Sequence, residues 1–283
     1  MCPGNGSQYE LPGLFCLICA WPVGRTGGGD PMKTVFITAS PKKRWSNSSY
    51  LLSITKCFTK GEKVWVNFRG PKDYTRIFSE LDGADALVLG MPLYVDAVPS
   101  HVLVLLEALE KYVKSRQLHF KVYSLCNCGF YEGVQCELEL EVIECWCEKC
   151  NLKFCGGAGI GAGEMIGVLR LSPVIGLIEM IVEFIIRLII LKPEALSLSE
   201  ILHCLNPLGV LISILVFVLF SIGPWICAAN VGRSVTKLCS HKISYSTVSF
   251  CPAFSFVFFA SIYWVLRAFI IHFIPAWKLF RKV

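Results

Sequence analysis

The chain has 283 residues, of which 54% are hydrophobic and 17% are charged, and its formal net charge is +6. Globular chains that dissolve in water are usually about 45–50% apolar and about a quarter charged, so this composition argues against a disordered, fibrous or wholly water-soluble protein. Residues 1–164 hold 17 basic and 17 acidic residues, whereas residues 165–283 hold 10 basic and 4 acidic ones. The basic excess surrounds apolar segments and forms no stripe, which indicates a membrane flank and no nucleic acid partner.

This asymmetry predicts three parts. Residues 1–31 are rich in Gly and Pro, and their one short apolar run has no basic residue before it and is too short to span a bilayer. We therefore expect a disordered leader or a mis-assigned start, with Met32 as the physiological first residue. A domain over residues 32–164 and a membrane region over residues 165–283 follow.

From Met32 onward, segments with the pattern of strands alternate with segments that have helical spacing. The predicted strands are Thr34–Thr38, Lys63–Phe68, Asp85–Gly90, Phe120–Leu125 and Lys153–Ala158. Helices are expected over Ser46–Cys57, over Tyr74–Leu81 and from Ser100 onward, where one face is apolar and the other carries i,i+4 ion pairs. Cys136–Cys150 fits a strand or a helix, and we choose a helix because the next segment already supplies the fifth strand.

Five strands joined by helices predict an α/β domain with a doubly wound, five-stranded parallel sheet and right-handed crossovers. In such sheets ligands bind beyond the carboxyl ends of the strands, at the switch point of the strand order. Three loops are therefore expected to carry the chemistry: those after Thr38, Gly90 and Leu125.

The sequences of these three loops are similar to those of a known protein family. The first reads Ala39-Ser40-Pro41-Lys42-Lys43-Arg44-Trp45-Ser46-Asn47-Ser48, the second Pro92-Leu93-Tyr94 with Pro99-Ser100 after it, and the third Asn127-Cys128-Gly129-Phe130. Together they resemble the flavin loops of the flavodoxin-like NAD(P)H-dependent FMN reductase family, and we expect a bacterial member with C-terminal membrane helices. The likeness covers residues 32–164. Ala39, Lys42 and Ser48 stand where that family usually has Gly, Arg and Thr.

The resemblance implies the cofactor FMN and a set of residues that would bind it. Its phosphate would be held by Ser40, Lys42, Ser46, Asn47 and Ser48, its ring would lie along Pro92, Leu93, Tyr94 and Val95, and its pyrimidine edge would meet Asn127, Cys128 and Gly129. Hydroxyl groups and free amides at a strand-to-helix turn suit a phosphate monoester. The alternatives are an ordinary helix cap for the serines, a core aromatic for Tyr94 and a plain turn for Asn127.

The function implied is a membrane-anchored FMN oxidoreductase with NADH or NADPH as the electron donor. The flavin would carry the chemistry, so no catalytic side chain is nominated. Two alternatives stay open: an FMN electron carrier without enzymatic activity, and a membrane interaction protein whose flavodoxin-like fold holds no cofactor.

The chain contains 15 cysteines, which we interpret as reduced, buried thiols. Cys145, Cys147, Cys150 and Cys155 have nearly the spacing of metal ligands, but Cys145 and Cys147 point to different sides of a helix. We therefore predict no metal site.

The membrane region has two charge-free stretches, and we expect spans over Leu208–Ala229 and Val248–Ile271. Pro173–Leu191 is also apolar but carries Glu179, Glu183 and Arg187, so it could be a span, an interfacial helix or the helix that covers the sheet. We expect the cell membrane as the location, with the flavin domain on the cytoplasmic side. The expected partners are membrane lipid, a quinone or a redox partner protein, and a second copy of the chain in a homodimer.

Overall fold

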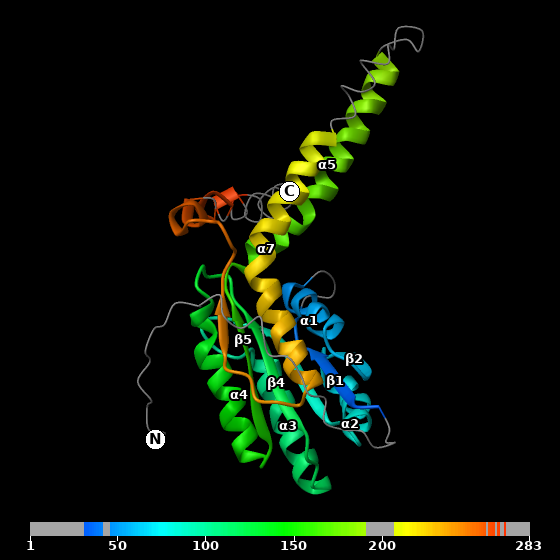
Figure 1. The fold of residues 1–283 in the computed structure, drawn as a ribbon, viewed down its shortest axis with the longest axis vertical. Coiled ribbons are helices and arrows are strands. Elements are labelled where there is room, and N and C mark those ends of the chain that lie inside the picture. The colour runs from blue at the N-terminus through cyan, green and yellow to red at the C-terminus, as the bar shows by residue number, and fades with distance from the viewer. Residues whose placement is uncertain are drawn as a thin grey trace, which may run out of the picture. The chain divides into compact units, whose positions relative to one another are not determined.

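The computed structural model describes residues 31–41, 46–190, 207–258, 260–263, 265–266 and 269 (Figure 1). The predicted leader lies outside these residues except for Pro31. The strands are β1 (Lys33–Thr38), β2 (Glu62–Asn67), β3 (Ala86–Pro92), β4 (Lys121–Asn127), β5 (Lys153–Ile160) and β6 (Ser244–Ser246). The helices are α1 (Asn47–Cys57), α2 (Tyr74–Leu81), α3 (Ser100–Arg116), α4 (Glu137–Lys149), α5 (Gly163–Ile190) and α7 (Pro207–Thr236), with 3-10 turns over Pro71–Asp73 and Gly133–Cys136.

The six strands form one parallel sheet in the order β2-β1-β3-β4-β5-β6. The first five strands in this order give the flavodoxin-like arrangement 2-1-3-4-5, which confirms the predicted fold class. The helix chosen for Cys136–Cys150 is also confirmed, because α4 occupies that segment. The sixth strand corrects the predicted count of five: Ser244–Ser246 pairs with Ala158–Ile160 at the edge of the sheet.

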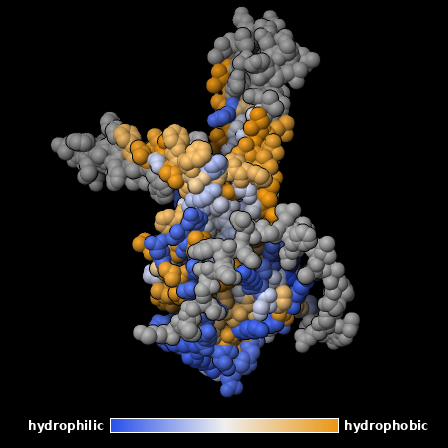
Figure 2. Space-filling model, turned by 60° about the vertical axis from the view of Figure 1, so that its left-hand side comes forward, coloured by the Kyte–Doolittle hydropathy of each residue, from blue (hydrophilic) through white to orange (hydrophobic). Residues whose placement is uncertain are grey.

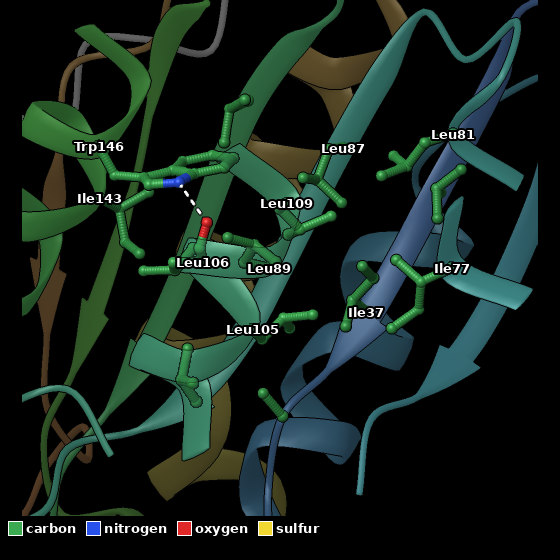
Figure 3. Close-up of a cluster of buried hydrophobic side chains, with 14 of the residues drawn as sticks. Ile37, Ile77, Leu81, Leu87, Leu89, Leu105, Leu106, Leu109, Ile143 and Trp146 are labelled. Carbon is green, nitrogen blue, oxygen red and sulfur yellow. Dashed lines mark hydrogen bonds between the residues drawn. The ribbon is translucent and has the colours of Figure 1, made fainter. Parts of the chain in front are cut away.

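Helices cover both faces of the sheet, as a parallel sheet requires. One face packs against α2, α3 and α4 in a large aliphatic core (Figure 3). In this core the Trp146 indole NH donates to the Leu106 carbonyl at 2.9 Å and so joins α4 to α3. Successive residues of β1 alternate between the two faces of the sheet. Val35 and Ile37 enter this core, while Phe36 enters the core on the opposite face.

The opposite face is covered by α1 and by the C-terminal half of α7. Ala228, Val231 and Val235 of α7 are completely buried there. The two helices approach so closely that a Cβ on Gly232 would lie 2.4 Å from the Thr55 carbonyl oxygen. The Thr55 hydroxyl also donates to the Ala228 carbonyl at 3.0 Å. α7, which lies far from α1 in the sequence, therefore contacts α1 through small residues.

α5 follows β5 directly, but only its start packs on the sheet, where Ile166 is buried. The helix begins at Gly163, before the predicted start at Pro173, and most of its described apolar side chains between Val168 and Ile186 are exposed. Among the described residues, this face of the sheet is therefore covered by α1 and α7, and not by residues 173–190 of the segment that the sequence left open. The domain boundary after residue 164 stays a prediction, to which the structure adds that α7 and β6 come from beyond it.

Two helical stretches, Gly163–Val182 and Gly209–Thr236, are long and apolar enough to cross a membrane. They belong to α5 and α7, which pack against each other. The predicted span Val248–Ile271 falls partly outside the described residues, and within it a shorter apolar helix covers Ala253–Tyr263. Val248 and Cys251, at the start of that span, are buried in the core beneath α7.

The contact between α7 and the sheet yields a stability prediction. Replacing Val235 with Asn removes buried methyl groups and places an amide in an apolar core, which should lower the free energy of unfolding by roughly 2–4 kcal/mol. Lys237→Asn, two residues further along and exposed, introduces the same side chain and should change it by less than about 0.5 kcal/mol. Thermal unfolding of the detergent-solubilised full chain measures both. Equal effects would contradict the docked position of α7.

Candidate functional site

The three loops singled out in the sequence follow β1, β3 and β4, so they all lie at the carboxyl edge of the sheet. β1 and β3 are neighbours, but the chain leaves β1 through α1 on one face and leaves β3 through α3 on the other. This divergence is the switch point of the strand order, where open α/β sheets bind their ligands.

The first loop leads into α1, where Ser46 caps the helix. The Ser46 hydroxyl oxygen accepts from the Ser49 amide at 3.0 Å, and its hydroxyl group donates to the Ser49 hydroxyl at 2.6 Å. Ser46 thus performs the capping role that the sequence analysis kept as an alternative. Ser40 is buried at the end of β1, and Lys42 lies outside the described residues.

Asn127 connects all three loops. Its side-chain oxygen accepts from the Ser48 hydroxyl at 2.6 Å, and its carbonyl accepts from the Leu93 amide at 2.9 Å. Ser48 belongs to the first loop and Leu93 to the second, while Asn127 itself ends β4 and begins the third. The interpretation of Asn127 as a plain turn residue is therefore too narrow, because its two groups hold the loops together.

Asn47 ties the first loop to the start of α5. Its side-chain nitrogen donates to the Gly163 carbonyl at 2.5 Å. The side-chain oxygen of Asn47 is buried and has no hydrogen-bond partner among the described residues. A buried amide oxygen without a donor is costly and invites a ligand group that can supply one.

The second loop makes a tight turn with strained backbone. Tyr94 and Ala97 exchange backbone hydrogen bonds of 3.1 Å in both directions. Between them, Val95 and Asp96 have φ angles of 49° and 55°. The left-handed region is unfavourable for a β-branched residue and costs of order 1–3 kcal/mol, and such strain concentrates at functional sites. The turn leaves Tyr94 40% exposed and Val95 96% exposed, so neither is a core residue, whereas Pro92 and Leu93 are buried.

The third loop and the start of α5 lie side by side. The Gly163 amide donates to the Cys128 carbonyl at 2.8 Å, and Cys128 itself is buried. Gly129 is exposed, and among the described residues a Cβ built there would meet only the Glu164 Cγ, 3.9 Å away.

Sequence reasoning missed Glu164, although an acidic residue in the first turn of the helix after β5 was the available signal. Burial, and then the charge of the nearby Glu164 carboxylate, raise the pKa of the Tyr94 phenol above its ordinary value. A negative charge therefore lies at the junction of the second loop, the third loop and α5.

The buried thiols that the sequence predicts include a group beneath the third loop. Cys126, Cys128 and Cys136 are buried together, and the Cys136 thiol interacts with both of the others. The Cys126 thiol donates to the carboxyl group of Glu139, which is completely buried. Burial raises the pKa of Cys126 to about 12 and that of Glu139 to about 7.

The cysteines that the sequence analysis weighed as metal ligands are mostly buried as well. Cys147, Cys150 and Cys155 are buried, while Cys145 is exposed. In the described part of the chain, no three His, Cys, Asp or Glu side chains are arranged to hold a metal ion.

Comparison with known proteins found no matching family model and no matching curated protein. Among solved structures, the Trp repressor binding protein of Bacillus subtilis matches at a TM-score of 0.38 and 12% identity, over 46% of this chain and 84% of that one. NAD(P)H:quinone oxidoreductase from Methanothermobacter marburgensis matches at 0.37 and 14%, over 49% and 94%. An FMN-dependent NADH-azoreductase from Bacillus anthracis matches at 0.30 and 11%, over 65% and 98%.

Of these solved proteins, the second is named as an NAD(P)H:quinone oxidoreductase and the third as an FMN-dependent enzyme. At such identities and TM-scores they carry no argument about this chain, and its flavodoxin-like fold rests on the observed order of its strands.

The buried Glu139 carboxyl predicts a pH-dependent stability. Its pKa is raised in the folded state, so its proton is retained there while the unfolded chain loses it; the contribution to stability is full below about pH 4.5 and is lost as the pH rises to about 7. Glu139→Gln keeps the shape without the charge, and should stabilise the fold above pH 7 by on the order of 3 kcal/mol. Unfolding temperatures between pH 4.5 and 8 measure this, with the exposed Glu141→Gln as the control. Parallel pH profiles for the Glu139 variant and the unchanged chain would contradict the assignment.

Proposed function

We propose that this protein is an FMN-dependent oxidoreductase that takes electrons from NADH or NADPH and is anchored in a membrane by α5 and α7. The observation that carries the proposal is the meeting of three polar loops and the N-terminus of α1 at the switch point of a 2-1-3-4-5 sheet. In sheets of this order, the flavodoxin-like ones, FMN binds at the switch point between β1 and β3.

The residues of the first loop fit a phosphate group. The first amides of α1 have no partner inside the helix and lie at the positive end of its dipole. Because the hydroxyl groups of Ser46 and Ser48 and the Ser49 amide already bond to protein atoms, we assign the phosphate mainly to the backbone amides of Asn47 and Ser48. Ser40, Lys42 and the Asn47 amide would complete its surroundings.

The second and third loops fit an aromatic ring system. The exposed face of Tyr94 could stack on the flavin beside Pro92, Leu93 and Val95. The open space at Gly129 would admit the ring edge, with Asn127 and the Cys128 backbone beside it. When bound, FMN supplies the two-electron chemistry of hydride transfer. The chain's own residues bind and orient the cofactor, and we assign no catalytic side chain.

The arrangement of α5 and α7 supports the proposed orientation in the membrane. Both helices join the domain at one end, because α5 begins at Gly163 and α7 packs on the sheet from Ala228 onward. The basic residues Arg233, Lys237 and Lys242 therefore lie on the side of the domain. Lys and Arg accumulate on the cytoplasmic side of membrane proteins, which favours a cytoplasmic flavin domain. Free thiols among the described cysteines also suit a reducing compartment.

For the partners, we propose membrane lipid, a quinone or a redox protein as electron acceptor, and a homodimer. A second candidate function is a membrane interaction protein whose fold holds no cofactor. One observation favours it: the side chains of Ser46, Asn47 and Ser48 all bond within the protein.

The two functions differ in the visible spectrum of the detergent-purified protein. Bound oxidised flavin absorbs at about 450 nm, and anaerobic NADH or NADPH should bleach this band if the protein is an oxidoreductase. Flavin that does not bleach would indicate an electron carrier. Absence of flavin even after incubation with FMN would favour the interaction protein.

A substitution at Gly129 tests the position of the ring. Val at this exposed position would make only an ordinary contact with Glu164 among the described residues, so the unfolding temperature should change little, whereas a bound flavin edge would be displaced. We expect FMN affinity to fall at least about tenfold, equivalent to about 1.4 kcal/mol. His119→Val, an exposed change in the loop before β4 at the amino edge, is the control and should leave affinity unchanged. Unchanged binding in Gly129→Val would reject the third loop as part of the site.

A further inference from the structure

We infer that the carboxyl edge of the sheet, with its three loops, lies in the headgroup layer of a lipid bilayer, so that the protein acts on amphiphilic acceptors dissolved in the membrane. This inference rests on the proposed function for the reaction, but the position of the edge follows from contacts that do not involve flavin.

No linker separates the loops from the apolar helix. α5 begins within the site, where Gly163 bonds to Cys128 and Asn47, and Glu164 lies beside Gly129. The first exposed apolar side chain, Val168, comes four residues after Glu164. At 1.5 Å per residue, this is a rise of about 6 Å. Whatever covers the apolar part of α5 must therefore come close to the loops.

An aromatic and basic cluster lies at the same level. The Trp225 indole NH donates to the Tyr50 hydroxyl at 2.7 Å, and the Arg170 guanidinium carbon lies 4.8 Å from the centre of the Tyr50 ring. Phe217 lies against both aromatic residues. Tyr50 belongs to the first turns of α1, directly after the capped N-terminus. Trp, Tyr and Arg are the side chains that settle at membrane interfaces, which places the boundary at this cluster.

Burial changes along both helices at this cluster. On α7, Leu211, Ile212 and Leu215 are 51–59% exposed, whereas the helix is buried against the sheet from Ala228 onward. On α5, Val174, Ile175 and Ile178 beyond Arg170 are likewise 49–54% exposed. Figure 2 shows this apolar surface gathered over α5 and α7, with hydrophilic surface over the opposite, amino edge of the sheet. Exposed apolar area this continuous calls for a covering medium, and lipid matches its chemistry.

The acidic residues of α5 lie too far along the helix to argue against a membrane boundary at this cluster. Glu179 lies nine residues beyond Arg170, a rise of about 13 Å, and residues 171–178 between them carry no charge. Whether α5 and α7 cross the bilayer or end inside it, Arg170 and the loops lie at the bilayer surface. The inference therefore concerns the depth of the site, and not the number of spans.

The depth of Trp225 tests the inference directly. The full chain is reconstituted into phosphatidylcholine vesicles whose acyl chains carry bromine at shallow or deep carbons, and the fluorescence contribution of Trp225 is obtained by difference from Trp225→Phe. We expect shallow bromine to quench this contribution at least about twofold more than deep bromine, as for other interfacial tryptophans. Trp146, buried between α3 and α4, is the matched control and should be quenched by neither. A Trp225 contribution insensitive to both lipids would overturn the inference.

A second reporter covers the case in which Trp225→Phe disturbs the fold. Leu171→Trp adds an indole on the exposed side of α5, one residue beyond Arg170, and should gain the same shallow quenching. If Leu171→Trp stays unquenched, α5 does not enter lipid and the inference fails.

The acceptor is tested in the same vesicles with reduced protein. A benzoquinone with an isoprenoid tail should reoxidise it at least about tenfold faster than the tailless headgroup at equal total concentration, because the tail concentrates the acceptor beside the site. Equal rates would overturn the membrane-dissolved acceptor. If the protein binds no flavin, the proposed function fails, while the bromine measurements still decide where the edge lies.

Discussion

The fold depends on one constraint: a parallel sheet must be covered on both faces, and the helix that follows β5 does not cover it. α5 leaves the sheet after its first turns, so the face beside α1 would stay open without a later segment. α7 returns to fill it, and Gly232 allows its backbone to meet that of Thr55. Because α5 and α7 pack together on their way out and back, the domain and the apolar helices form one connected structure.

This constraint also shapes the candidate site. The loop that would hold a phosphate is bonded to the start of α5 through Asn47, and to the third loop through Ser48 and Asn127. A shift of α5 relative to the sheet would therefore also displace the N-terminus of α1. The strained turn that contains Tyr94 and Val95 lies near Glu164, the second residue of α5. Because the site and the start of α5 share these hydrogen bonds, the proposed depth of one in a membrane fixes the depth of the other.

Local patterns were enough to predict the five main strands, the helix over Cys136–Cys150 and the positions of the three loops, because alternation and helical spacing act within a few residues. The contacts that join distant segments could not be read this way. β6 has only three residues, and its pairing with β5 depends on where α7 ends. The bond between Ser48 and Asn127 spans 79 positions, and the thiol group around Glu139 assembles from β4, the third loop and the region of α4. Each depends on the completed sheet.

α7 shows why apolarity alone left the membrane region ambiguous, and which signal distinguishes its two halves. Hydropathy treats burial in lipid and burial against protein alike, so the whole of Gly209–Thr236 passes the test for a span. The first half is made of large side chains such as Leu211, Leu215 and Leu219, which are exposed, whereas the second half contains Ser221, Ala228 and Gly232, which are buried. Small residues permit close contact between backbones, and large ones suit a fluid medium. On our proposal, the change from large to small residues along one helix marks where lipid gives way to the sheet, and it falls beside Tyr50 and Trp225.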